Sequence, residues 1–463
     1  MKIHSFKQIL LLIGTSALLF SCGTSRQFQR STVETEGLYG AVENTDSTTI
    51  ATQPWEELFT DPFLKNLITE GLANNPDMQI AVQRVLEAEA YFTQGKAALL
   101  PGVSARASQN YTRNPESVYP NGPRDVTSYQ LGLEASWEID IWGKLRSSKR
   151  AAYANLLATD AGQKAVQTRL ISTIAMYYYQ LAALDAKLEI TKQTVANNID
   201  LVETMKVLKE SGLVTGAAIV QSEAARYAAE VTLPDLDQQI RETENALSTL
   251  LGRVPGPVER GSLSEQEINS TLASGIPAQL LDNRPDVMQA EFQVMQAYEL
   301  TNNARAYFYP SLTLTASSGF GATELDELLD PSSFAANVIG GLAAPIFQKK
   351  ANVTRLKVAE TKQEAALQNL KSTLLQAGQE VNDALSLYDN SEKKMVLRDS
   401  QLEALEKSVE YTQELLSFGS ATYTEVLNAQ QSLLGAQLSQ VNDQIQQLTA
   451  VVSLYRALGG GWR

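Results

Sequence analysis

The residue types that carry most enzyme chemistry are almost absent from this chain of 463 residues. Its only histidine is His4 and its only cysteine is Cys22, both close to the N-terminus. If the first 21 residues are removed, the remaining 442 start at Cys22 and contain no histidine. A Ser-His-Asp triad, a Cys-His pair, a zinc site and an internal disulfide bond are then impossible. The sequence therefore predicts a protein that is not an enzyme and that holds no metal and no cofactor.

Cys22 itself stands where a covalent modification is expected. A basic start and a short apolar run over 9–20 are typical of a secretory signal peptide, and the run is too short to span a membrane. Leu19-Phe20-Ser21-Cys22 resembles the bacterial lipobox, in which the cysteine is acylated and becomes the new N-terminus. Gly23 follows, so the aspartate that retains enteric lipoproteins in the inner membrane is absent. We predict that Cys22 is lipidated and anchors the chain in the outer membrane.

The charge balance narrows the choice of partners. The chain has 52 acidic and 38 basic side chains, which gives a formal net charge of −14. Loss of a signal peptide over 1–21 would remove two lysines and take the charge to −16. Nucleic acid and anionic membrane surfaces are therefore poor partners for the chain as a whole.

The chain repeats itself once. Asn75-Pro76-Asp77 opens one helical pattern and Arg284-Pro285-Asp286 opens another, and the two prolines lie 209 residues apart. Gly212 and Gly419, each followed by two apolar residues at the same spacing, lie 207 apart. Two copies of a unit of about 200 residues explain this better than several unrelated domains.

Each copy contains one pair of segments in which apolar and polar residues alternate. In the first copy the odd positions over 129–141 carry Tyr, Leu, Leu, Ala, Trp, Ile and Ile, whereas the even positions carry polar residues or glycine. This period of two predicts a strand with one apolar and one polar face. A weaker alternation over 103–111 precedes it, and 312–320 with 334–344 form the second pair. We expect four long strands, near the roughly nine to eleven residues that span a bilayer.

The rest of the chain has the spacing of long helices. Apolar residues step by three and four through 367–388 and continue in the same register to Leu416, and 171–202 shows the same pattern. Such sustained heptads predict coiled-coil packing. No proline interrupts 124–233 or 346–463, so helices of roughly 65–70 residues are possible, each about 100 Å long.

These elements limit how the chain could cross a membrane. No segment after the signal peptide approaches the roughly 18 apolar residues of a transmembrane helix, so only a closed barrel could do so. Four strands cannot close a barrel, since the smallest have about eight. A cyclic trimer would supply twelve strands, with apolar faces toward lipid and polar faces around a wet lumen. A soluble antiparallel sheet with one buried face would produce the same alternation.

Four motifs in chain order, together with the repeat, resemble the outer-membrane factors of tripartite efflux pumps. These form the TolC superfamily, and the lipobox points to its lipoprotein branch of OprM or NodT type, whose pumps are RND transporters. The resemblance covers nearly the whole mature chain. The motifs are Trp55-Glu-Glu-Leu-Phe-Thr-Asp-Pro62, Glu138-Ile-Asp-Ile-Trp-Gly-Lys144, Arg284-Pro-Asp-Val287 with Tyr309-Pro-Ser-Leu-Thr313, and Leu454-Tyr-Arg-Ala-Leu-Gly-Gly-Gly-Trp462.

The resemblance implies a mostly α-helical protein with a transmembrane β-barrel. Its fold would be a TolC-like homotrimeric channel with four strands per protomer, long coiled-coil periplasmic helices and an internal two-fold repeat. The expected division is a signal peptide (1–21), a lipid-anchored segment (22–60), a first repeat (61–254, hairpin about 102–141), a connecting equatorial segment (255–283), a second repeat (284–458, hairpin about 311–346) and a C-terminal tail (459–463).

Two turns between helices are expected to dock the periplasmic adaptor. They are Ser211-Gly-Leu-Val-Thr-Gly216 and Phe418-Gly-Ser-Ala-Thr422. Glycine permits the left-handed backbone that a tight helix–helix turn needs, which is a purely structural reason for its presence. In the family such turns also meet the helical hairpins of the adaptor. The resemblance therefore implies docking roles for Gly212, Leu213, Val214 and Gly419.

The resemblance also implies a periplasmic gate just after the second turn. In TolC-type chains two acidic positions spaced by three form rings that narrow the tunnel, and this spacing puts both side chains on one helix face. Glu425 matches the first position, whereas Asn428 stands where an aspartate is usual, so this gate should be less acidic. The positions of TolC's polar latch are occupied by Leu416 and Ala421, so that latch is not preserved. A solvated helix glutamate would be the plain alternative for Glu425.

The function implied is a passive duct for the export of small toxic molecules, opened when the adaptor and the inner-membrane RND-type transporter dock. Partners would be two further copies in a homotrimer, the adaptor, the transporter and outer-membrane lipid, with no nucleic acid. A type I protein-secretion duct and a poreless, lipid-anchored structural coiled coil are the alternatives. Only six scattered methionines remain in the mature chain, which gives no soft-metal path.

Overall fold

The computed structural model describes residues 28–30, 38, 48–117, 123–267, 274–275 and 277–463. The predicted lipidation site Cys22 lies outside these residues. The chain divides into two compact units: unit 1 comprises Met1–Thr32, Arg84–Thr159 and Ala290–Leu370, and unit 2 comprises Val33–Gln83, Asp160–Gln289 and Lys371–Arg463. In the described part of the chain, no helix combines the length and the apolar character needed to cross a membrane.

The described chain is mainly helical, as predicted. Its α-helices are α2 (Trp55–Leu58), α3 (Pro62–Asn74), α4 (Pro76–Ala97), α5 (Lys144–Glu210), α6 (Gly216–Glu230), α7 (Thr232–Leu250), α8 (Leu280–Asn283), α9 (Pro285–Ala306), α10 (Ala351–Ser417) and α11 (Tyr423–Ala457). Short 3-10 turns occupy Ile50–Thr52, Leu263–Glu265, Pro277–Gln279 and Pro331–Ser333. The helices α5 and α10 each have 67 residues, within the predicted range.

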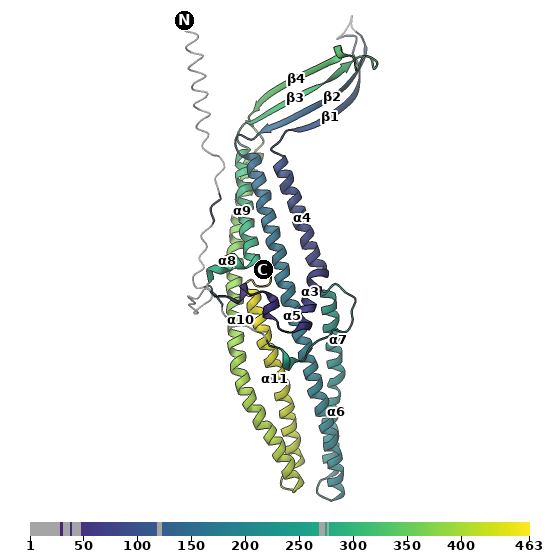
Figure 1. Ribbon diagram of the computed structural model, residues 1–463, viewed down its shortest axis with the longest axis vertical. Coiled ribbons are helices and arrows are strands. Elements are labelled where there is room, and N and C mark those ends of the chain that lie inside the picture. The colour runs from purple at the N-terminus through teal and green to yellow at the C-terminus, as the bar shows by residue number, and fades with distance from the viewer. Residues whose placement is uncertain (1–27, 31–37, 39–47, 118–122, 268–273, 276) are drawn as a thin grey trace. The chain divides into compact units, whose positions relative to one another are not determined.

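Unit 1 contains a four-stranded antiparallel sheet (Figure 1). Its strands are β1 (Gly102–Arg113), β2 (Asp125–Ile139), β3 (Ser311–Ala322) and β4 (Phe334–Ala343), in the order β1-β2-β3-β4. Both predicted hairpins are present, and the pairing of β2 with β3 joins them into one sheet. At this central seam Gly132 lies opposite Gly319, and a side chain on either would meet the backbone of the other strand.

The register carries one apolar face across all four strands. Leu131 lies opposite Ala107 on one side and Phe320 on the other, and Ala316 lies opposite Val338, although Ser318 interrupts the face opposite Leu133. Directly opposed residues share a face, so the alternation predicted for β2 extends to its neighbours. In the single chain this face is uncovered: Leu133 is 56% and Val338 is 69% exposed. The opposite face carries Ser104, Arg106, Gln130, Glu134, Ser317 and Asn337.

The predicted strand over 129–141 is displaced along the chain: β2 begins four residues earlier, at Asp125, and ends two residues earlier, at Ile139. β2 ends at Ile139 because the next residue, Asp140, serves the following helix. Its two carboxylate oxygens accept the backbone N–H groups of Leu145 and Arg146, at 3.1 and 2.9 Å. Asp140 therefore caps the N-terminus of α5, and Ile141 belongs to the connection and not to the sheet.

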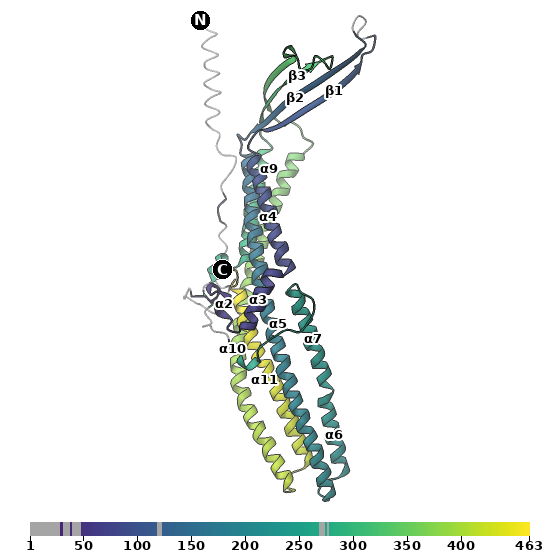
Figure 2. The ribbon, with the colours of Figure 1, turned by 45° about the vertical axis from the view of Figure 1, so that its right-hand side comes forward.

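In unit 2 two pairs of helices lie side by side, α5 with α6 and α10 with α11 (Figure 2). The apolar stripe predicted on α5 is fully buried at Ile171, Ile174, Tyr178 and Leu181. The stripe on α10 is likewise buried, from Leu374 to Ala384. Heptad spacing therefore identified the core-facing side of each long helix over these stretches, whereas Ile199, near the end of the predicted stripe on α5, is 39% exposed.

Candidate functional site

The two predicted turns in unit 2 have the same backbone construction. After α5, Gly212 has φ +77°, and the N–H of Leu213 donates to the carbonyl of Leu208 at 2.9 Å. After α10, Gly419 has φ +71°, and the N–H of Ser420 donates to the carbonyl of Leu415 at 2.8 Å. Both are Schellman motifs, in which a left-handed glycine lets the chain leave the helix while its last carbonyls stay hydrogen-bonded.

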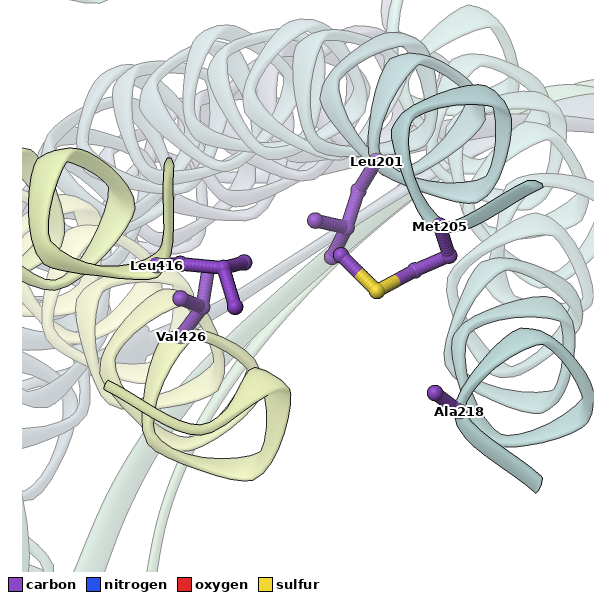
Figure 3. Close-up of a cluster of buried hydrophobic side chains, with 5 residues drawn as sticks. All are labelled: Leu201, Met205, Ala218, Leu416 and Val426. Atoms are coloured by element: carbon purple, nitrogen blue, oxygen red, sulfur yellow. The ribbon is translucent and has the colours of Figure 1, made fainter. Parts of the chain in front are cut away.

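An apolar cluster supports both turns. Figure 3 shows its buried members, which come from the ends of α5 and α10 and from the starts of α6 and α11: Leu201, Met205, Ala218, Leu416 and Val426. Val214 and Tyr423 pack against it. We call these five buried residues the turn cluster. Leu416, which the resemblance predicts at a TolC latch position, is buried in this cluster.

The outer surface of the turns is open and partly apolar. Leu213 is 60% exposed and Phe418 is 75% exposed. A Cβ placed on Gly212, Gly216 or Gly419 would meet no atom within 4 Å. Among the predicted docking residues, Leu213 is therefore available to a partner, whereas Val214 packs inward.

Glu425 is bound to its own helix. It is the third residue of α11, and its Oε2 accepts the backbone N–H of Thr422 at 2.7 Å and the Thr422 hydroxyl at 3.2 Å. Thr422 and Glu425 form a capping box, in which each side chain meets the backbone of the other. The carboxylate is nevertheless exposed, and it lies at the positive end of the helix dipole.

Asn428 is also exposed and lines a groove of about 890 Å³ in unit 2, formed by α5, α6, α7 and α11. Most of the residues that line the groove are Asn, Gln, Thr or Ala. Lys187 is one of its few charged groups, and burial lowers the pKa of its ammonium below the usual value. Gln430 also lines the groove, and its buried Oε1 has no hydrogen-bond partner in the part of the chain that the structure describes. Among the described residues, no group of three or more His, Cys, Asp and Glu could hold a metal ion.

Two polar centres of unit 2 were not expected from the sequence. In the first, Asp61 caps α3 through the N–H of Phe63 at 2.8 Å and accepts the side-chain amide of Gln266 at 2.7 Å. Tyr178 also donates its hydroxyl to Asp61 and accepts the N–H of Gly261 at 2.9 Å. Burial raises the pKa of Tyr178, and the hydrogen bond to Asp61 raises it further.

The second centre is Arg284, whose side chain is only 7% exposed. It binds Asp286 through two hydrogen bonds of 3.0 and 2.6 Å, and it donates to Glu380 and to the carbonyl of Ala457 at 2.8 Å each. Burial by itself would lower the pKa of Arg284, but the bonds and charges of its two carboxylates raise it. Trp462 of the C-terminal motif donates to the carbonyl of Asn283 at 2.8 Å. This hydrogen bond connects the C-terminal motif to the segment that directly precedes the Arg284 motif.

Comparison with known proteins agrees with this architecture. The solvent efflux pump outer membrane protein SrpC of Pseudomonas putida is 29% identical over 455 residues, which cover 98% of this chain and 97% of SrpC. The probable outer membrane lipoprotein SilC of Salmonella typhimurium is 29% identical over 466 residues, 99% of each chain. The cation efflux system protein CusC of Escherichia coli (strain K12) is 29% identical over 438 residues, 94% of this chain and 93% of CusC.

A solved structure of CusC matches with a TM-score of 0.86 and 27% identity over 95% of this chain and 100% of that one. This confirms the TolC-like fold and the predicted resemblance. The model of the family described as "Outer membrane efflux protein" matches residues 67–253 and again 276–460. The chain belongs to the outer membrane efflux protein family.

Proposed function

We propose that this chain is the outer-membrane channel of a tripartite efflux pump, in which three copies form a passive duct for small toxic molecules. The observation that carries the proposal is the continuous, uncovered apolar face of the four-stranded sheet. An exposed face of this kind needs lipid or a partner to cover it. In a trimer the faces of twelve strands would meet lipid, and the polar faces would line the lumen.

The edges of the sheet support the same assembly. In the described part of the chain no strand pairs with the outer side of β1 or of β4. Unpaired edges favour pairing with another chain. We infer that β1 of one protomer pairs with β4 of the next, which closes the sheet without any further segment of the chain.

We further propose that energy comes from an inner-membrane RND-type transporter joined through an adaptor. Neither Gly143-Lys144 nor Gly319-Phe320-Gly321 has the spacing of a phosphate-binding loop. The two open turns would receive the helical hairpins of the adaptor, with Gly212 and Gly419 setting the backbone and Leu213 making apolar contact. Val214 would act from beneath, through the turn cluster.

We propose Glu425 and Asn428 as the residues of the periplasmic gate. With threefold symmetry each would form a ring, one charged and one neutral. The exposure of both side chains and their spacing of three on α11 support this role. The name of SilC, a probable outer membrane lipoprotein, supports lipidation at Cys22. The names of SrpC and CusC refer to solvent efflux and to cation efflux, so similar channels serve different substrates. We therefore propose that the inner-membrane transporter selects the substrate class.

Conductance and cross-linking of the purified protein test the pore directly. Because Cys22 is the only native cysteine, pairs of cysteines introduced on β1 and β4 report on pairing between protomers alone. We expect covalent trimers from cysteine pairs at adjoining positions and conducting channels in planar bilayers. Trimers that never conduct, even with the gate residues substituted, would contradict the proposal and favour a poreless structural role.

A further inference from the structure

Unit 1 contains a cavity of about 460 Å³ where the strands give way to helices. Its walls come from three connecting segments, 138–144, 306–311 and 343–355. The cavity therefore lies at the end of the apolar sheet face, the level at which a bilayer containing that sheet would give way to water. Neither the gate nor the docking turns include any of these residues.

Two cations meet at one aromatic ring in this cavity. The Nζ of Lys144 lies 5.0 Å and the Cζ of Arg355 lies 3.8 Å from the ring centre of Tyr307. Lys144 is paired with Glu138 at 2.5 Å. Arg355 donates to the side-chain oxygen of Asn352 at 2.8 Å, and no carboxylate in the described chain pairs with it. The guanidinium is thus held in place by neutral groups, with donors left over for an anion.

Comparison of the two repeats shows that the start of α10, at this cavity, lacks a capping carboxylate. The N–H of Ser147 donates to Gly143 at the start of α5, and that of Thr354 donates to Lys350 at the start of α10, 207 residues later. At this offset the capping residue Asp140 corresponds to Phe347. The second copy therefore lacks the carboxylate that caps the first, and no residue in the described chain accepts the N–H of Asn352 at the cavity wall.

The local charge is opposite to that of the whole chain. Segments 141–159 and 344–359 contain no acidic residue. Together they carry eight basic ones: Lys144, Arg146, Lys149, Arg150, Lys349, Lys350, Arg355 and Lys357. Three of these, Lys144, Arg146 and Arg150, pair with Glu138, Asp140 and Glu299, so the excess of positive charge comes from the other five. The net charge of −14 makes anionic surfaces poor partners in general, but it does not describe these two segments, which both border the cavity.

The neighbourhood also offers apolar contact. Ile346 is 97% exposed and Phe347 is 80% exposed, in the connection that forms one cavity wall. Trp142 stacks on Tyr309 with ring centres 5.0 Å apart and donates to the carbonyl of Pro310 at 2.7 Å. Trp and Tyr gather where a membrane meets water, because one end of each ring system is apolar and the other is polar.

We infer that this cavity binds the phosphodiester headgroup of an anionic phospholipid. Arg355 and the N–H of Asn352 bind the phosphate, Lys144, Lys349 and Lys350 supply attraction, and Ile346 and Phe347 contact the acyl chains. The exposed apolar pair favours a lipid over free phosphate. This inference rests on the proposed function, since it requires the sheet to lie in a bilayer.

Native mass spectrometry of the full-length, detergent-extracted trimer tests it, with dioleoyl phosphatidylglycerol as the probe. We expect saturable binding of up to one lipid per protomer. Arg355→Gln should weaken it about tenfold, because a charge-assisted contact is lost. Lys357→Gln is the matched control: it removes the same charge from the same segment outside the cavity and should change binding less than twofold. Equal losses in the two variants would overturn the inference in favour of diffuse attraction.

A second variant guards against misfolding. Ala351→Asp places a carboxylate at the first position of α10, where it favours the helix and occupies the anion site. The trimer should persist and lipid binding should fall at least tenfold; undiminished binding would refute the site. Inorganic phosphate and glycerol 3-phosphate should compete only weakly, and binding of these ions as tight as that of the lipid would overturn the choice of a lipid. If the trimer binds lipid but does not conduct, the proposed pore is contradicted. If the trimer conducts but Arg355→Gln and Lys357→Gln lose lipid binding equally, only this inference is contradicted.

Discussion

The carboxylate of Glu425 holds the backbone N–H of Thr422 at 2.7 Å, so the residue proposed for the gate also fixes the first turn of α11. Any substitution at Glu425 therefore acts on two properties, the charge of the proposed ring and the stability of the turn. The two can be separated, because the hydrogen bond needs only an oxygen acceptor and the ring needs a charge.

Glu425→Gln should keep the cap and remove the charge. We expect reduced cation selectivity of the trimer in planar bilayers, measured as a smaller reversal potential in a salt gradient, with little change in thermal stability. Thr422→Ala is the control, since it keeps the charge and should cost about 1 kcal/mol of capping energy. Selectivity that is unchanged in Glu425→Gln would refute the gate.

Leu213→Asp should abolish efflux while leaving trimers in the membrane. Leu213 is 60% exposed on a docking turn, so a charge there meets water in the free channel and apolar adaptor in the complex. Val254→Asp is the control, because Val254 is even more exposed and follows the end of α7, where Gly252 meets Asn74 of α3. Loss of trimers in Leu213→Asp, by gel analysis of membranes, would show that the turn is structural and does not dock.

Alanine at Gly212 or Gly419 should destabilise the turns by about 1–2 kcal/mol, the cost of a left-handed backbone for a residue with Cβ. Space is not the cause, since a Cβ at either glycine meets nothing. Gly216→Ala, at the first residue of α6 and without a positive φ, should be neutral or slightly stabilising. Hydrogen exchange at the ends of α5 and α10 measures the difference, and equal protection in all three variants would contradict the assignment.

The pKa of Tyr178 is raised in the folded protein, so folding favours its neutral form. Its contribution to stability is fully present below about pH 10, the ordinary tyrosine value, and is lost as pH rises above it. Tyr178→Phe should lower the unfolding temperature at pH 8, because Asp61 and Gly261 lose a partner, at a cost of about 1–3 kcal/mol. The Tyr178→Phe variant should also lose less stability than the wild type as the pH rises above 10. Tyr179→Phe is the matched control at neutral pH, since the Tyr179 hydroxyl makes no hydrogen bond within the described chain; equal effects at pH 8 would contradict the role of Asp61.

Local patterns in the sequence predicted much of this fold. Heptad spacing identified the buried faces of α5 and α10, alternation identified the apolar face of β2, and Gly212 and Gly419 have the left-handed backbone expected of them. The capping box at Thr422 and Glu425 was also readable, since Thr-x-x-Glu before an apolar run is its signature. The resemblance to gated channels implies a role for the charge of Glu425 and says nothing of its role in the capping box.

Contacts between distant segments could not be predicted in this way. The pairing of β2 with β3 depends on two hairpins about 180 residues apart along the chain. Arg284 meets Glu380 96 residues away, and a lone Arg-Pro-Asp motif does not name that partner. The cavity at Tyr307 gathers single residues from three connections, none of which forms a motif by itself.

Growth inhibition tests the central claim, that this channel exports small toxic molecules, most directly. A strain that lacks the chain would be compared with the same strain complemented, across a panel of dyes, antibiotics, detergents and metal salts. We predict hypersensitivity to a subset of these compounds, restored by the wild-type chain and not by Leu213→Asp. Equal growth with and without the chain on every compound, in a strain that has no other outer-membrane efflux channel, would contradict the account.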